Sequence, residues 1–72
     1  MQKPSITGIY RHYKGNEYEV IGAGTHTKTD EKFVVYRSLK DTQLIWIRPY
    51  DMFFESVIVD GKTLPRFAKL TD

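Results

Sequence analysis

The chain has 72 residues, no cysteine, and 11 basic against 9 acidic side chains. A chain of this length makes one domain, expected over 1–72, and buries only about 60% of the surface that its unfolded form exposes. Without cysteine it can form neither a disulfide nor a thiolate zinc site, and a net charge of +2 is too small to indicate a DNA- or membrane-binding protein. The aromatic content of 14% favours a folded, β-rich core.

The N-terminal stretch MQKPSITGIY lacks the apolar run of a signal peptide, and no segment approaches the ~20 apolar residues of a membrane span. The missing cysteine is also typical of a reducing compartment. We therefore expect a soluble, cytoplasmic protein without a membrane partner and without a cofactor.

The first predicted element is a hairpin of residues 8–14 and 17–27 around Gly15-Asn16, a pair that favours a type II′ turn. A two-residue turn predicts the cross-strand pairs Lys14–Glu17, Tyr13–Tyr18, His12–Glu19 and Arg11–Val20. Gly22 and Gly24 then interrupt the second strand and indicate a bend, which we interpret as a barrel corner.

A polar loop at 25–32 leads to a third strand at 33–39, rich in β-branched and aromatic residues. A turn at Asp41-Thr42 precedes a fourth strand at 44–48, which Pro49 ends because proline lacks a backbone N–H. The segment YDMFFE is too short for a stable helix and predicts one helical or 3₁₀ turn near 50–54.

The last predicted hairpin joins 56–59 to 64–70 around Asp60-Gly61, a strong type I′ signal. Pro65 confines the final strand to a sheet edge or places it at the strand's beginning. Five or six short antiparallel strands with one helical turn predict an all-β domain, a small partly open barrel of the SH3-like kind. An OB-fold is disfavoured, since it needs longer strands and a helix between the third and fourth.

Metal binding and nucleophilic catalysis find little support in the sequence. The two histidines, His12 and His26, could bind a metal only with Glu19, Asp30 or Glu31, and they lack the HxxxH or HxH spacing of common zinc sites. No cysteine and no GxSxG motif is present. A catalytic or metal-dependent domain is the least favoured hypothesis.

Binding chemistry is better represented. The loop from Thr25 to Glu31 offers hydroxyls, an imidazole and carboxylates that could contact a small ligand or hold their own turn. Alternation places Arg11 with Ile9, Tyr13 and Val20, and Arg48 with Leu44 and Trp46. A guanidinium on such a face stacks on an aromatic ring or pairs with a carboxylate, for which Glu55 and Asp51 are the expected partners.

A second binding hypothesis is single-stranded nucleic acid, RNA in particular. Exposed rings on a β-barrel face stack bases, and neighbouring cations contact phosphates. The side chains that could do so are Tyr10, Tyr36 and Trp46 as platforms and Arg11, Arg37 and Arg48 as charges.

Taken in order, the motifs YRHYKG, THTKT, VVY, WIRP, MF and PRF resemble a family of small, mostly bacterial domains of unknown function, from about Gly8 to Leu70. The resemblance implies an SH3-type β-barrel and no assigned activity. The residues that carry it are Tyr10, Arg11, His12, Lys14, Gly15, His26, Thr27, Tyr36, Trp46, Arg48, Pro49, Met52, Phe53, Pro65, Arg66 and Phe67. Lys28 departs from the acidic residue that relatives tend to carry between two threonines.

The sequence thus favours a non-enzymatic binding module for a small ligand, peptide or protein, with a single-stranded nucleic-acid module as the alternative. The predicted ligand-binding residues are Arg11, His12, His26, Thr27, Thr29, Tyr36 and Arg48.

Overall fold

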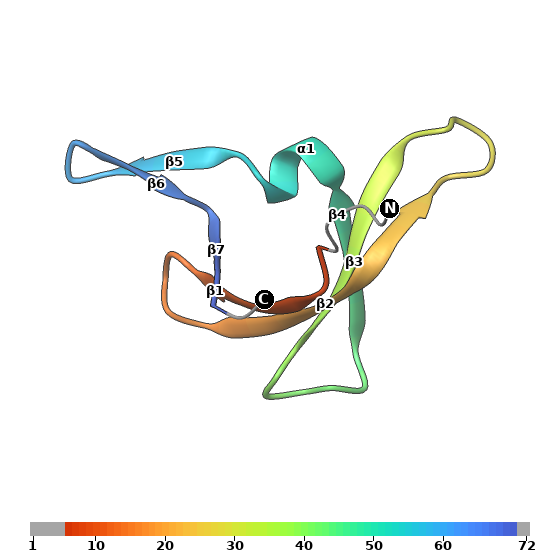
Figure 1. The fold of residues 1–72 in the computed structure, drawn as a ribbon, viewed down its shortest axis with the longest axis horizontal. Helices are drawn as coiled ribbons and strands as arrows, with labels where there is room; N and C mark the ends of the chain where they lie inside the picture. The colour runs from red at the N-terminus through yellow and green to blue at the C-terminus, as the bar shows by residue number, and fades with distance from the viewer. Residues whose placement is uncertain (1–5, 71–72) are drawn as a thin grey trace, which may run out of the picture.

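The computed structural model describes residues 6–70, which form two antiparallel sheets and one short helix. The main sheet has the spatial order β4-β3-β2-β1-β7 (Figure 1), with bounds β1 (Gly8–His12), β2 (Glu17–Thr25), β3 (Lys32–Ser38), β4 (Ile45–Pro49) and β7 (Phe67–Lys69). A separate hairpin contains β5 (Ser56–Val59) and β6 (Lys62–Pro65), and α1 (Tyr50–Phe53) joins β4 to β5. The predicted small all-β domain with a helical turn near 50–54 is confirmed. Residues 1–5 and 71–72 of the expected domain lie outside the described residues.

The hairpin of β1 and β2 forms, but the predicted register was wrong. Tyr10 pairs with Tyr18, and Arg11 pairs with Glu17 rather than with Val20, so all four expected pairs are shifted by three positions. The connecting loop is longer than a two-residue turn, because the His12 N–H donates to Asn16 O (2.7 Å) and the Gly15 N–H donates to His12 O (2.7 Å). Gly15 has φ 110°, which favours glycine.

An irregularity in β2 coincides with the predicted glycine positions. Val20 pairs with Tyr36 whereas Gly22 pairs with Val35, so a β-bulge lies between Val20 and Gly22. The irregularity predicted at Gly22 is thus a bulge, which increases the local twist, whereas Gly24 pairs regularly with Phe33. The strand nevertheless continues through Gly24 to Thr25, and the far end of the β2–β3 hairpin extends from the sheet as an arm (Figure 1).

The hydrophobic core lies between the main sheet and α1. Phe53 of α1 is fully buried, stacks on Phe67 (4.1 Å between ring centres), and meets Tyr36 edge-on at 5.3 Å. Pro49 ends β4 and precedes the helix, as its missing N–H predicts. The other buried core residues are Tyr10, Val20 and Val34.

The turn predicted at Asp60-Gly61 is confirmed, but the segment after it forms two strands instead of one. Asp60 and Gly61 have φ 52° and 77°, the positive values that a type I′ turn requires at both central positions. The segment 64–70 is not one strand as predicted. It divides at Arg66, because the Arg66 N–H donates to Glu55 O (3.0 Å) and the Tyr13 N–H donates to Arg66 O (3.0 Å).

The main sheet is open. β4 and β7 are its edges and do not pair with each other, so the likeness to an SH3 barrel stays a prediction. Within residues 6–70 no helix has the length and apolar character needed to cross a membrane.

Candidate functional site

The two faces of the main sheet carry different side chains. Since successive side chains of a strand point to opposite faces, the register decides which residues share one. The face toward α1, the inner face, carries Tyr10, His12, Tyr18, Val20, Val34, Tyr36, Ser38, Trp46, Arg48 and Phe67. The outer face carries Arg11, Glu17, Glu19, Arg37, Ile45 and Ile47.

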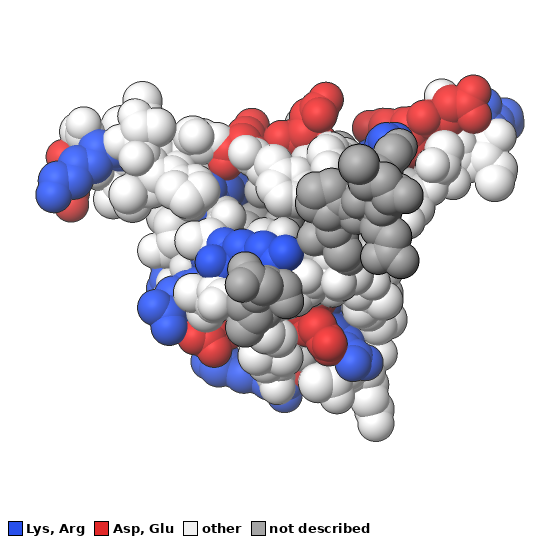
Figure 2. Space-filling view, viewed as in Figure 1, with Lys and Arg blue, Asp and Glu red and all other residues white. Residues whose placement is uncertain are grey.

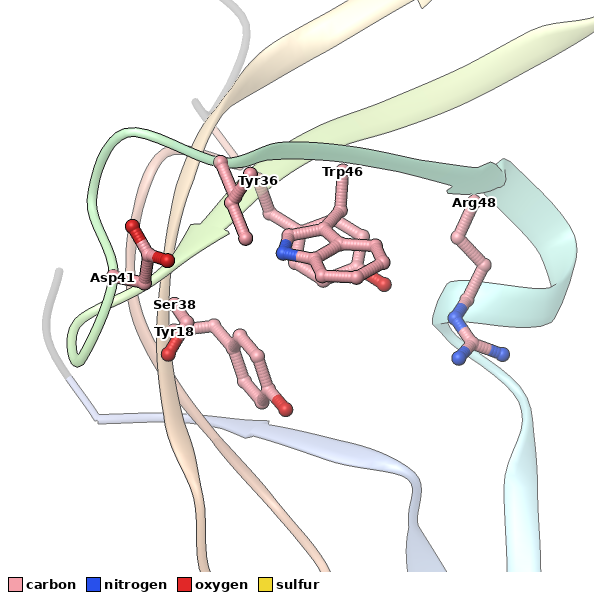
Figure 3. Close-up of a pocket in the computed structure, with 7 residues that line it drawn as sticks. Tyr18, Tyr36, Ser38, Asp41, Trp46 and Arg48 are labelled. Atoms are coloured by element: carbon pink, nitrogen blue, oxygen red, sulfur yellow. The ribbon is translucent and has the colours of Figure 1, made fainter.

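A pocket of about 420 Å³ opens on the inner face at the β4 edge (Figure 3). This volume lies in the range of small-ligand sites, about 300–1,000 Å³. Strands β2, β3 and β4 and the β3–β4 loop supply its lining, which consists of Tyr18, Tyr36, Ser38, Asp41, Leu44, Trp46 and Arg48.

Three aromatic side chains form the apolar part of the pocket. Tyr36 is buried and meets Tyr18 edge-on at 5.6 Å between ring centres. Trp46 is 50% exposed and makes no ring contact with another residue of the described range 6–70. An indole held in this way can stack on a planar group of a ligand.

Arg48 supplies the cation of the pocket. Its guanidinium carbon lies 5.7 Å from the centre of the Phe67 ring, so the predicted stacking on an aromatic ring is confirmed. Its Nε is buried without a hydrogen-bond partner, and no ion pair joins Arg48 to another described residue. A buried donor left unpaired costs about 1–3 kcal/mol. Because the rest of the guanidinium also has no hydrogen-bond partner among residues 6–70, its charge is open to a ligand in the pocket.

Arg66, which precedes Phe67 in the chain, is a second guanidinium with an unpartnered buried atom, and its charge acts on His12. Its Nη2 donates to Glu55 Oε1 at 2.7 Å, yet its Nε is buried without a partner. Glu55, one of the two carboxylates expected to pair with an arginine, pairs with Arg66. Arg66 lies between β6 and β7 and not within a strand, contrary to the prediction.

His12 completes this basic cluster. Its ring lies 4.9 Å from the centre of the Phe67 ring. Burial lowers the pKa of the imidazole, and the charges of Arg66, Arg48 and Lys14 lower that pKa further. The Lys14 N–H donates to Nδ1 at 3.2 Å, which assigns the proton of the neutral ring to Nε2 and leaves Nε2–H as a donor.

The opposite end of the pocket is acidic. Asp41 lies away from Arg48 across the rings (Figure 3). Its Oδ1 accepts a hydrogen bond from the Gln43 N–H at 3.3 Å, and Ser38 Oγ accepts one from the Lys40 N–H at 3.1 Å. Both side chains therefore hold the β3–β4 loop while they line the pocket.

The structure brings some of the predicted site residues together and separates others. Tyr36 and Arg48 both line the pocket, and His12 lies beside Phe67 near Arg48. Arg11 is on the outer face, ion-paired with Glu17 at 2.8 Å. Its predicted grouping with Val20 was wrong, because Val20 lies on the inner face.

The predicted loop residues lie away from the pocket, at the end of the β2–β3 arm. His26 Nδ1 accepts hydrogen bonds from the Lys28 N–H (3.1 Å) and the Thr29 N–H (3.3 Å), and Thr29 Oγ1 accepts one from the Glu31 N–H (3.3 Å). His26 and Thr29 thus hold the loop, and Thr27 is exposed in it. Among residues 6–70, no three His, Asp or Glu side chains form a group that could hold a metal ion.

The platform expected for nucleic acid is not assembled on one face. Tyr10 is buried and donates its hydroxyl to Ile6 O at 2.9 Å, and burial raises its pKa, with a further contribution from Tyr50. Arg37 lies on the outer face and pairs with Glu19 at 2.8 Å. Only Trp46, Tyr36 and Arg48 of the expected set meet in the pocket.

Sequence reasoning missed Tyr18, Ser38, Asp41 and Leu44 as pocket residues, and Arg66 as a neighbour of His12. Alternation along the fourth strand does place Leu44, Trp46 and Arg48 on one side, as predicted. The position of Tyr18 opposite Ser38 depends on the β2–β3 register, for which the sequence offers no short turn signal.

Comparison with known proteins places the chain in a family. Residues 8–69 match the model described as "Protein of unknown function (DUF1653)". The chain belongs to the DUF1653 family. A solved DUF1653 protein from Bordetella bronchiseptica is similar, with a TM-score of 0.80 and 35% identity over 89% of this chain and 85% of that one. No curated protein matches the chain. The resemblance predicted from the motifs is confirmed, and the DUF1653 description assigns no activity.

Proposed function

We propose that this protein is a non-enzymatic binding module that takes a small ligand into the pocket between Trp46 and Arg48. The observation that carries the proposal is the state of these two side chains. A half-exposed indole and a guanidinium without an ion-pair partner among residues 6–70 line one concave space. A few placed polar groups in a mostly apolar hollow are typical of ligand sites.

The polar groups of the lining support binding rather than catalysis. Ser38 and Asp41 are engaged with backbone N–H groups of their own loop. A general base or nucleophile would have to reach a substrate with its proton-accepting atom free. Each of these side chains already accepts a backbone hydrogen bond that holds the loop, so the rings and Arg48 are the main contacts available to a ligand.

The distribution of charge supports a small ligand over a long polyanion. A protein that follows a nucleic-acid backbone needs a continuous row of unpaired cations. Arg11 and Arg37 are ion-paired on the outer face, and Figure 2 shows basic and acidic side chains interspersed on the face it displays. Acidic side chains gather there over α1 and the β2–β3 loop.

An NMR titration of the ¹⁵N-labelled protein with a mixed library of metabolites and short peptides tests the proposal. We expect shifted amides to cluster at Tyr18, Tyr36, Ser38, Trp46 and Arg48. The Trp46→Ala variant should lose at least about tenfold in affinity, since stacking on an aromatic side chain contributes about 1–3 kcal/mol.

The matched control is Ile45→Ala, which changes the neighbouring residue on the outer face of the same strand. It should keep the affinity of the unmodified protein. Shifts confined to the outer face, or equal affinity for Trp46→Ala and the unmodified protein, would refute the pocket as the binding site.

A further inference from the structure

The inner face arranges its charges along the length of the pocket. Asp41 is at one end, the rings of Tyr18 and Trp46 follow, and Arg48 is at the other end (Figure 3). Arg48 and His12 both lie within 5.7 Å of the centre of the Phe67 ring.

The spacing of the two main contacts limits the shape of a ligand. Trp46 and Arg48 are two residues apart on β4 and share the inner face. Alternate residues of a strand are about 6.6 Å apart along its axis. A ligand that contacts both therefore needs a planar group and an anionic group joined by a short spacer.

We propose that the ligand is a planar heteroaromatic ring that carries a phosphate through a short spacer, the chemistry of a nucleoside monophosphate. The ring lies against Trp46 and Tyr18, and the phosphate lies at Arg48 beside His12 and Arg66. This inference rests on the proposed binding function and names the ligand class of the same pocket.

The basic cluster favours phosphate over a carboxylate or a neutral polar group. The Arg48 guanidinium lines the pocket and has no hydrogen bond or ion pair to another residue of 6–70, and His12 offers Nε2–H. Arg66 adds a second guanidinium near His12, although its Nη2 is already paired with Glu55. A phosphate carries close to two negative charges and three acceptor oxygens, so it can use donors from several side chains, whereas a carboxylate has one charge and two oxygens. Burial is the main cause of the lowered pKa of His12, and the charges of Arg66 and Arg48 contribute to it.

Asp41 fixes the direction of the ligand in the pocket. Its carboxylate repels a phosphate from the β3–β4 loop end and can accept a hydrogen bond from an exocyclic amine of a base. The phosphate is thereby directed to Arg48, at the opposite end of the lining.

The fluorescence of Trp46, the single tryptophan of the chain, measures binding directly. The probes are adenosine, guanosine, cytidine and uridine monophosphates, the four nucleosides, inorganic phosphate, and dinucleotides with and without a terminal phosphate. We expect at least one monophosphate to bind at least about tenfold more tightly than its nucleoside and than inorganic phosphate.

The dinucleotides distinguish the two sources of this chemistry. Tighter binding of the phosphorylated dinucleotide than of the monophosphate supports a nucleic-acid terminus as the source, and the reverse order supports a free nucleotide. Equal affinity for a monophosphate and its nucleoside overturns the inference, while the proposed pocket stands if Trp46→Ala removes both. No binding of any probe also overturns it, and the library titration then decides separately whether the pocket binds other ligands.

Two variants locate the phosphate. Arg48→Gln should reduce the preference for monophosphate over nucleoside to less than about threefold, because the charged donor is lost. Arg37→Gln, an arginine change on the outer face of the adjacent strand, should leave that preference unchanged. A circular dichroism melt of each variant verifies that it is folded. A folded Arg48→Gln variant with the full preference overturns the assignment.

Discussion

Both faces of the main sheet carry arginine side chains, but these arginines differ in whether a carboxylate pairs with them. On the outer face, Arg11 pairs with Glu17 and Arg37 pairs with Glu19, and each pair consists of direct cross-strand neighbours. On the inner face, Arg48 has no carboxylate partner among the described residues. An arginine in a strand rich in aromatic residues is therefore not itself a sign of a binding site. The sign is an arginine whose charge the fold leaves uncompensated.

The apolar side chains of the two faces differ in their exposure to solvent. Ile45 and Ile47 are exposed on the outer face, whereas Phe53, Phe67 and Tyr36 are buried against the inner one. Ile45 and Ile47 are neighbours on one face, but apolar atoms contribute about 55–60% of the exposed surface of folded proteins, so their exposure alone does not indicate a site. The inner face therefore combines the core and the pocket.

The largest expected effect concerns Phe53, which is fully buried. Phe53→Ala should lower the free energy of unfolding by about 3–5 kcal/mol, a large part of the ~5–15 kcal/mol available to a domain. Ile47→Ala, at a residue that is 62% exposed on the outer face, should change it by less than about 1 kcal/mol. Urea denaturation measures both. Equal effects would show that α1 does not seal the core.

The next largest effect should be a difference in stability between variants of two ion pairs, Arg66–Glu55 and Arg11–Glu17. Arg66 is 23% exposed in its pair with Glu55, whereas Arg11 is 54% exposed in its pair with Glu17. We expect Glu55→Gln to cost about 1 kcal/mol and Glu17→Gln less than about 0.5 kcal/mol, because solvent screens the outer pair more strongly. The difference should shrink in high salt. A larger loss for Glu17→Gln than for Glu55→Gln would contradict this ranking.

A smaller effect is expected from pH. The pKa of His12 lies below its ordinary value of 6.5 in the folded protein, mainly because of burial. Below pH 6.5 the unfolded chain binds more protons at this residue than the folded one, so its contribution makes stability fall as the pH drops toward the folded pKa. His12→Gln should reduce the loss of stability between pH 7 and the folded pKa. An unchanged profile in urea melts would argue against the His12 environment described above.

The smallest effect should come from Arg37→Gln. The pair of Arg37 with Glu19 is about one-third exposed on both sides, at 36% and 38%. Pairs of this kind contribute about 0.2–1 kcal/mol. We expect a loss near the lower limit, measured by denaturation at low and high salt. A loss above about 2 kcal/mol would mean that the outer face stabilises the fold as strongly as the inner one.

Local signals predicted most of the elements. Asp60-Gly61 specified its turn because both residues accept positive φ, and Pro49 marked the end of β4 because it lacks an N–H. The helical turn after Pro49 and the bulge near Gly22 also followed from neighbouring residues.

The errors arose where distant segments decide the local structure. The loop after His12 is held partly by the bond from the Tyr13 N–H to Arg66 O, and Phe67 pairs with His12. Both contacts involve residues more than 50 positions away, so the local sequence at Gly15-Asn16 predicts a two-residue turn instead. The pocket was found only in part for the same reason, since Tyr18 joins Trp46 through the pairing of three strands.

The junction at Arg66 has a practical consequence. Among the described strands, β5 and β6 pair only with each other, and the Arg66 contacts to Glu55 hold the base of their hairpin. The tip at Asp60 and Gly61 is exposed and projects away from the sheet (Figure 1). Exposed tips of this kind tolerate added residues. An affinity tag or a fluorescent label inserted there would lie away from the proposed pocket and should leave ligand binding unchanged.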